Sequence, residues 1–164
     1  MNHIYLLLGS NMGNCQKQLS VACKHIAREI GHITRASALY STAAWGKNDQ
    51  PDFLNQVVIV DTPLPAEAVM QCILAIEEKM GRIRTKKYDP RIIDIDILFF
   101  NKAILQTETL SIPHPQIQNR RFVLVPLNEL SPNLIHPVLQ KTIHQLLRVC
   151  QDPLPVKKNS TISG

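Results

Sequence analysis

Strand and helix patterns alternate along the first hundred residues, and their order restricts the fold more than any other feature of the chain. Two stretches repeat apolar residues at three- and four-residue steps, which is typical of amphipathic helices. The others are short apolar runs rich in β-branched residues, as in buried strands. In chain order, the sequence predicts a strand at 3–8, a helix at 15–30, strands at 33–42 and 54–61, a helix at 65–80 and a strand at 91–100.

This β-α-β-β-α-β order predicts an α+β protein with a ferredoxin-like core, an antiparallel sheet that helices cover on one face. Further helices are expected at 122–130 and 142–150. A chain of 164 residues is expected to form a single domain, here over residues 1–151. Residues 152–164 combine prolines, lysines and small polar residues, and we expect them to be a disordered tail.

Composition indicates a folded protein with an anionic partner. The formal charge of +5 does not choose between a nucleotide, a nucleic acid and a phosphorylated metabolite. The four cysteines are widely spaced, which favours reduced thiols in a cytoplasmic protein over disulfides or a zinc site. No apolar stretch reaches membrane-spanning length, so no membrane partner is expected.

The last strand of the predicted core carries two carboxylates. Asp94 and Asp96 are two positions apart, so a strand would point both to one face. The opposite, apolar face would consist of Ile93, Ile95, Ile97 and Phe99. Neighbouring carboxylates repel each other, and a hard cation such as Mg²⁺ between them would relieve the repulsion. The alternative is two solvated aspartates on an exposed strand face.

A basic stretch leads directly into this strand. Five cations lie within ten residues: Arg82, Arg84, Lys86, Lys87 and Arg91. Beside magnesium-binding carboxylates they would suit a polyphosphate, because phosphoryl transfer depends on positioning and on neutralising charge on the phosphate oxygens. The alternative is a solvated loop with no ligand.

A long loop between the second and third strands offers groups for a flat, polar heterocycle. Trp45 and Phe53 could supply stacking area, and the Asn55 amide could donate to and accept from the edge of a ring. Alternatively, the two aromatic side chains simply cover the edge of the sheet.

Later segments offer groups for phosphate. Arg120 and Arg121 could bind phosphate oxygens in bidentate fashion, which a lysine cannot do. His114 lies between two prolines and could donate to phosphate or have a purely structural role. The chain has no P-loop motif, so bound ATP would be held in another way.

The segment from Pro90 to Leu98 resembles the signature of the hydroxymethyldihydropterin pyrophosphokinases of folate biosynthesis. Other segments resemble that family in the same order: 8–11, Thr42, Gly46, 50–55, Glu77 with 81–84, 113–114, 119–120 and Phe122. The resemblance covers roughly residues 3 to 150. It implies an enzyme that transfers pyrophosphate from ATP to the hydroxymethyl group of a reduced pterin and releases AMP, with two Mg²⁺ ions.

The resemblance also implies roles for individual residues. Asp94 and Asp96 would hold the metal ions and, with Arg82 and Arg91, form the catalytic set. The ATP-binding residues would be Glu77, Arg82, Arg84, Tyr88, Arg91, Ser111, His114 and Arg120. The pterin-binding residues would be Thr42, Ala43, Trp45, Gly46, Phe53, Asn55, Asp94 and Phe122. ATP and the pterin are then the expected partners of a monomer that binds no nucleic acid.

Two other function classes stay open. An RNA-binding module can share this strand order, but only 5% of the residues are aromatic, and a central strand bearing aspartates would repel phosphate. A magnesium-dependent nucleotide hydrolase could use the same aspartates. Its products would differ, because it would release ADP or phosphate without any pterin.

Overall fold

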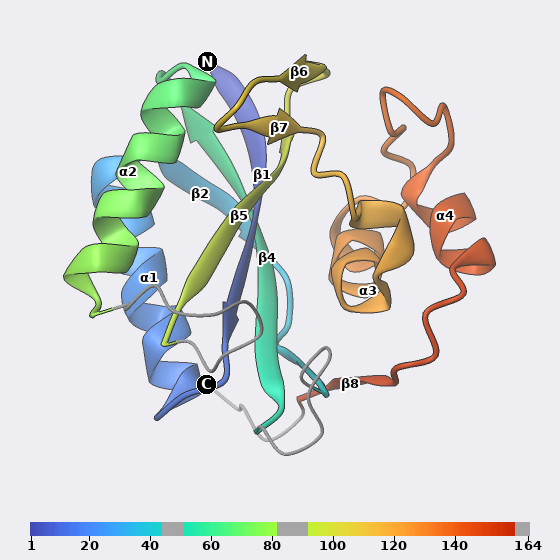
Figure 1. Ribbon diagram of the computed structural model, residues 1–164, viewed down its shortest axis with the longest axis horizontal. Helices are drawn as coiled ribbons and strands as arrows, with labels where there is room; N and C mark the ends of the chain where they lie inside the picture. Colours follow the sequence, from blue (N-terminus) through green and yellow to red (C-terminus); the bar gives the residue numbers. More distant parts are fainter. Residues whose placement is uncertain (44–50, 82–91, 160–164) are drawn as a thin grey trace.

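The computed structural model describes residues 1–43, 51–81 and 92–159, which form an antiparallel sheet between two layers of helices (Figure 1). The strands of this sheet are β1 (Asn2–Ser10), β2 (His32–Ala36), β3 (Tyr40–Thr42), β4 (Phe53–Thr62), β5 (Asp94–Phe100) and β8 (Val156–Lys158). Helices α1 (Cys15–Glu29) and α2 (Ala66–Lys79) lie on one face. The other face is covered by η1 (Ile117–Asn119), α3 (Arg121–Leu130) and α4 (Ile143–Val149). The short strands β6 (Leu105–Gln106) and β7 (Ser111–Ile112) pair separately.

The strand order confirms the ferredoxin-like core. The sheet runs β5-β1-β4-β3-β8. Strand β2 also pairs with β4, along a different part of its length from β3. The aspartate strand, β5, therefore lies at the edge of the sheet, and the expectation that it is central was wrong. Its outer edge is covered locally, since Glu77 accepts a hydrogen bond from Ile95 N at 2.8 Å and His114 N donates to Leu98 O at 3.0 Å.

Two hydrophobic cores stabilise the two faces of the sheet. The first joins β1, β4 and β5 to α1 and α2, through side chains such as Leu6, Ile26 and Ile73. The second joins the opposite face to α3 and α4, through Leu7 and Leu124 among others. The helices of the ferredoxin-like core thus cover one face, as predicted, and the C-terminal helices that were also expected cover the other.

A change of register on β5 alters its predicted alternation. Ile93, Ile95 and Ile97 belong to the first core, as expected. Leu6 pairs with Ile97 and Tyr5 with Phe99, so Leu98 is an extra residue opposite β1. Leu98 and Phe99 consequently both enter the second core, and the assignment of Phe99 to the isoleucine face was wrong.

The strand predicted at 33–42 is two strands, β2 and β3, that both pair with β4. Ala36 pairs with Val58 and Tyr40 with Asn55, so the segment that joins β2 to β3 has one residue more than the part of β4 opposite it. Ser37 bridges the break, because its N donates to Val57 O at 2.8 Å and its hydroxyl accepts from Val57 N at 3.0 Å.

The C-terminal segment is ordered where we expected disorder. Val156–Lys158 form β8, which pairs with β3 along its free edge. The prediction of a disordered tail was wrong for residues 152–159, since a strand partner far away in the sequence supplies the pairing. Residues 160–164 lie outside the described part of the chain.

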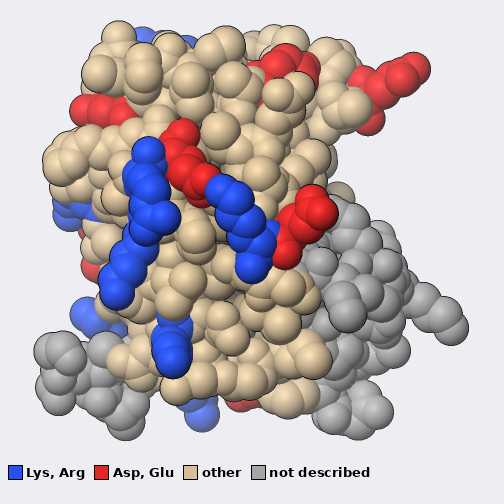
Figure 2. Space-filling model, turned by 90° about the vertical axis from the view of Figure 1, so that its left-hand side faces the viewer, with Lys and Arg blue, Asp and Glu red and all other residues tan. Residues whose placement is uncertain are grey.

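The surface charges, the cysteines and the length of the apolar helices are features that the composition had addressed. Figure 2 shows the face that α1 and α2 cover, where basic and acidic side chains are interspersed rather than gathered by sign. All four cysteines, Cys15, Cys23, Cys72 and Cys150, are free thiols. Among the described residues, no helix has both the length and the apolar character needed to cross a membrane.

Candidate active site

Three neighbouring strands bring Asp94, Gly9 and Asn55 into one row across the sheet. Asp94 of β5 pairs with Gly9 of β1, which pairs in turn with Asn55 of β4. Directly paired residues of antiparallel strands present their side chains to the same face. In the next row on that face Asp96 pairs with Leu7, which belongs to the second core. The two aspartates, both half-buried, therefore share the face that α3 covers, as predicted.

Gly9 allows a close approach of the Asn55 amide to the backbone of β1. A Cβ atom at this position would lie 2.8 Å from Asn55 Oδ1 and 3.7 Å from Phe53 Cδ1. The Asn55 side chain is only 3% exposed, and its Nδ2 has no hydrogen-bond partner in the described structure. A buried donor without a partner is costly, so this amide is suited to a ligand that brings an acceptor.

Aromatic side chains border the same face. Phe53 pairs with Thr42 and is two residues from Asn55, so all three lie on one side of the sheet. Phe122, in the first turn of α3, packs against the second core from above that side. The Arg120 guanidinium carbon lies 5.7 Å from the centre of the Phe122 ring. This part of the face therefore combines ring surfaces with a cation.

His114 is held as a neutral donor beside these groups. Its Nδ1 accepts a hydrogen bond from Gln116 N at 3.1 Å, which leaves the proton of a neutral ring on Nε2. Burial, reinforced by the nearby Arg120 cation, lowers the pKa of His114 to about 4, while Asp94 opposes the shift. At pH 7 this ring can donate from Nε2 without carrying a charge.

Other predicted residues take part in internal contacts. Thr42 is buried, and its hydroxyl donates to Pro155 O at 3.2 Å, so the hydroxyl itself is occupied. Ala43 follows it and is exposed. Glu77 is buried, and its carboxylate accepts from Ile95 N, between the two aspartates.

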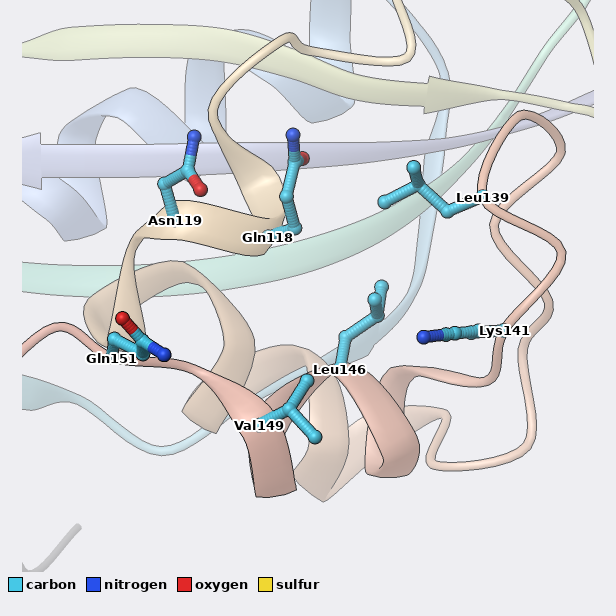
Figure 3. Close-up of a pocket in the computed structure, with 7 residues that line it drawn as sticks. All are labelled: Gln118, Asn119, Leu139, Lys141, Leu146, Val149 and Gln151. Atoms are coloured by element: carbon cyan, nitrogen blue, oxygen red, sulfur yellow. The ribbon is translucent and has the colours of Figure 1, made fainter.

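Two pockets lie near this face. One, of about 230 Å³, has both Ser111 and His114 in its lining. The other, of about 430 Å³, lies between η1 and α4 (Figure 3). It is lined by Gln118, Asn119, Leu139, Lys141, Leu146, Val149 and Gln151. None of the predicted site residues lines this second pocket.

The sequence model described as 7,8-dihydro-6-hydroxymethylpterin-pyrophosphokinase (HPPK) matches residues 5–132, most of the chain. The chain belongs to the HPPK family. It is 41% identical over 136 residues to a 2-amino-4-hydroxy-6-hydroxymethyldihydropteridine pyrophosphokinase of Methylorubrum extorquens, with 82% of this chain and 86% of that protein covered. It is 39% identical over 160 residues to a protein of the same name from Synechocystis, with 96% and 82% covered.

Solved structures show the same fold at lower identity. A Plasmodium falciparum HPPK-DHPS with pteroate matches with a TM-score of 0.73 at 21% identity, covering 90% of this chain and 42% of that one. The chain also matches a folic acid synthesis protein of Dictyostelium discoideum at 36% identity, covering 88% of this chain and 22% of that protein. The chain thus spans less than half of these larger proteins, whereas it spans most of the two bacterial HPPK relatives.

Several residues that the HPPK resemblance implied lie outside the described residues. They are Trp45 and Gly46 for the pterin, and Arg82, Arg84, Tyr88 and Arg91 for ATP and catalysis. The structure brings Asp94, Asp96, Asn55, Phe53 and Thr42 to one face of the sheet, with Phe122 packed over it. Ser111 lines a pocket with His114, and the Glu77 carboxylate contacts the edge of β5. Arg121, a candidate phosphate ligand, instead directs its guanidinium to two backbone carbonyls, Asp152 O and Cys150 O.

Sequence reasoning missed two residues beside this HPPK site. Gly9 follows the strand predicted at 3–8 directly and was left out of it, yet it lies within β1 and pairs with Asn55. A glycine at the end of an apolar run was a usable signal, because glycine within a strand often marks a close approach. Asp152 was placed in the tail, and nothing in its local sequence indicates its contact with α3.

The donor set on β5 fits magnesium. Hard oxygen ligands suit Mg²⁺, which commonly takes one or two carboxylates and completes its shell with water and phosphate oxygens. No group of three or more His, Cys, Asp or Glu residues forms a metal cluster in the part of the chain that the structure describes.

Proposed function

We propose that this protein transfers the pyrophosphoryl group of ATP to the hydroxymethyl group of 6-hydroxymethyl-7,8-dihydropterin, in folate biosynthesis. The observation that carries the proposal is the row Asp94, Gly9 and Asn55, which sets a carboxylate and an unsatisfied amide on one face, on either side of a glycine. The names of the bacterial relatives give the same reaction class.

The pterin would lie against the β4 side of this row. The Asn55 amide would pair with the polar edge of the ring, and Phe53 and Phe122 would stack on its two faces. Thr42 would border the slot through its backbone, since its hydroxyl is engaged with Pro155. We assign Ala43, Trp45 and Gly46 to the same slot from the family resemblance.

ATP would lie on the β5 side of the row. Asp94 and Asp96 would hold two Mg²⁺ ions, which neutralise charge on the phosphate oxygens when bound. The neutral His114 ring would donate from Nε2 to a phosphate oxygen, and Arg120 would add a cation. The remaining ATP ligands, assigned from the resemblance, are Glu77, Arg82, Arg84, Tyr88, Arg91 and Ser111.

In the reaction, the pterin hydroxyl oxygen attacks the β-phosphorus of ATP. The bond from that phosphorus to the oxygen that bridges it to the α-phosphate breaks, and AMP leaves with the bridging oxygen and its electron pair. The hydroxyl proton passes to water. The chain's own contribution is to hold the hydroxyl and the β-phosphate in line, because positioning and charge neutralisation dominate phosphoryl transfer. Arg82 and Arg91 are assigned to the transferring group.

The test is a product analysis with the purified protein, ATP and Mg²⁺. We expect AMP to form only when 6-hydroxymethyl-7,8-dihydropterin is present, in a one-to-one ratio with the pyrophosphorylated pterin. Release of ADP or free phosphate without the pterin would instead support the magnesium-dependent hydrolase.

We also propose that the enzyme acts as a cytoplasmic monomer that needs no nucleic acid. The free state of all four thiols is compatible with a reducing compartment. Light scattering at assay concentrations checks the oligomeric state, and a dimer would contradict the proposal.

A further inference from the structure

A segment that follows α4 connects two parts of the molecule that border the proposed pterin slot. This segment, Cys150–Lys158, is called the C-terminal strap below. It leaves the end of α4 and ends as β8 (Figure 1). On the way it contacts the first turn of α3 through Asp152, and β8 pairs with β3. It therefore touches both the helix that carries Phe122 and the strand that carries Thr42.

At α3 the strap supplies a helix cap. The helix begins at Arg121, and the preceding residue, Arg120, makes no capping hydrogen bond with its own side chain. Instead, Asp152 Oδ2 accepts from Arg121 N at 3.0 Å, and Oδ1 accepts from Leu154 N at 3.0 Å. Asp152 is only 6% exposed. A carboxylate here both satisfies a free N–H of the first turn and complements the positive end of the helix dipole.

The contact is reciprocal. The Arg121 guanidinium donates from Nε to Asp152 O at 3.3 Å and from Nη2 to Cys150 O at 3.4 Å. Arg121 and Asp152 thus each bind the other through both side chain and backbone. These bonds hold the start of α3 and the start of the strap together as one unit. Arg120 and Phe122 flank Arg121 directly, so their backbone positions depend on this unit.

At its other end the C-terminal strap pairs with β3, the strand that carries Thr42. Thr42 pairs with Val156, and its hydroxyl donates to Pro155 O at 3.2 Å. The strap therefore links Thr42 on one side of the slot to Phe122 on the other, over a short run of residues.

We propose that Asp152 is a positioning residue for pterin binding, acting through Arg121 on Phe122 and through the strap on Thr42. The inference rests on the proposed function, because it assigns Phe122 and Thr42 to the pterin slot. It adds a residue that touches no substrate and a segment that sequence reasoning left out of the enzyme.

The test compares Asp152→Asn with wild type in the AMP assay. The two N–H groups are bound by different carboxylate oxygens, and an amide replaces one of these oxygens with an NH2 group that cannot accept. In this geometry either the bond from Arg121 N or the bond from Leu154 N is lost. We expect the KM for the pterin to rise about fivefold, the change that loss of one helix N-cap typically produces in an equilibrium constant. The kcat at saturating pterin should stay within twofold, since no group at the reacting atoms changes. Titration of the pterin in the presence of a non-hydrolysable ATP analogue should show the same loss.

A second variant and a matched control complete the test. Arg121→Gln removes the guanidinium bonds to the strap but keeps the backbone N–H, so it should raise the pterin KM even if Asp152→Asn fails to fold. Thr142→Ala removes the cap of α4, where the hydroxyl accepts from Gln145 N at 3.1 Å, and should leave the pterin KM unchanged.

Two results would overturn the inference. One is a pterin KM within twofold of wild type in both strap variants. The other is an equal rise in Thr142→Ala, which would indicate general destabilisation. If wild type itself forms no AMP with the pterin, the proposed function fails instead, so the two failures are distinguishable.

Discussion

Replacing Gly9 with alanine is expected to weaken pterin binding while leaving ATP binding intact. The added Cβ would lie 2.8 Å from Asn55 Oδ1, closer than the 3.0 Å that real Cβ atoms essentially never cross. The next nearest atoms belong to Phe53 and again to Asn55, at 3.7 and 4.0 Å. All three contacts are therefore with the residues proposed to bind the pterin.

The magnitude follows from how the clash can be relieved. The Asn55 side chain is almost fully buried, and its Nδ2 has no hydrogen-bond partner to lose when the clash forces the amide to turn. The rotated amide no longer matches the edge of the pterin, and leaving a buried hydrogen-bonding group unpaired costs about 1–3 kcal/mol. A loss near the middle of that range corresponds to roughly thirtyfold weaker pterin binding.

The assay is a double-mutant cycle on pterin affinity, measured by titration with a non-hydrolysable ATP analogue present. If the clash with Asn55 is the cause, Gly9→Ala should add nothing to the loss already produced by Asn55→Ala. ATP-analogue affinity serves as the internal control and should stay within twofold in all variants.

Two outcomes would refute this reasoning. Pterin affinity within twofold of wild type in Gly9→Ala would mean that the row across the sheet does not bind the ring. Fully additive losses in the double mutant would mean that the methyl group acts through something other than Asn55.

Three further changes test other parts of the structure. Asp96→Ala should lower turnover by orders of magnitude and weaken magnesium-dependent nucleotide binding; near-normal turnover would remove its metal role. Glu77→Leu leaves Ile95 N without its buried acceptor, so the free energy of unfolding should fall by about 1–3 kcal/mol in urea titrations, while Glu77→Gln, which keeps an acceptor, should lose less. Burial lowers the pKa of His136, so unfolding at acidic pH takes up a proton. The stability that is fully present above pH 6.5 is therefore lost progressively as the pH falls below that value. His136→Asn, which retains an acceptor for the two backbone N–H groups on Nδ1, should show a flatter pH dependence of unfolding; an unchanged slope would contradict this.

The elements that local patterns encode were predictable. The apolar spacing of α1 and α2 and the β-branched run of β4 appear in the structure close to the predicted bounds. Asp94 and Asp96 share a face because two-residue alternation is a local property of any strand. The bulge at Leu98 ends that alternation, and the sequence Ile-Leu-Phe-Phe contains nothing that announces it.

The candidate site was predictable only in part. The aspartates and Asn55 were named from local patterns and Phe122 from the family resemblance. The structure places the first three on one face of the sheet, with Phe122 of α3 packed over that face. Gly9 was missed because its role depends on which β4 residue lies opposite it. The occupied state of the Thr42 hydroxyl was missed because its acceptor, Pro155, is more than a hundred residues away.

The sequence by itself determined the order of the elements, the face that Asp94 and Asp96 share and the family. Only the tertiary structure decided the register that sets Asp94, Gly9 and Asn55 in one row, and the ordering of the C-terminal strap on α3 and β3. The physical reason is that side-chain periodicity is a property of a few consecutive residues. Register and capping by Asp152 depend on hydrogen-bond partners that folding brings together from distant parts of the chain.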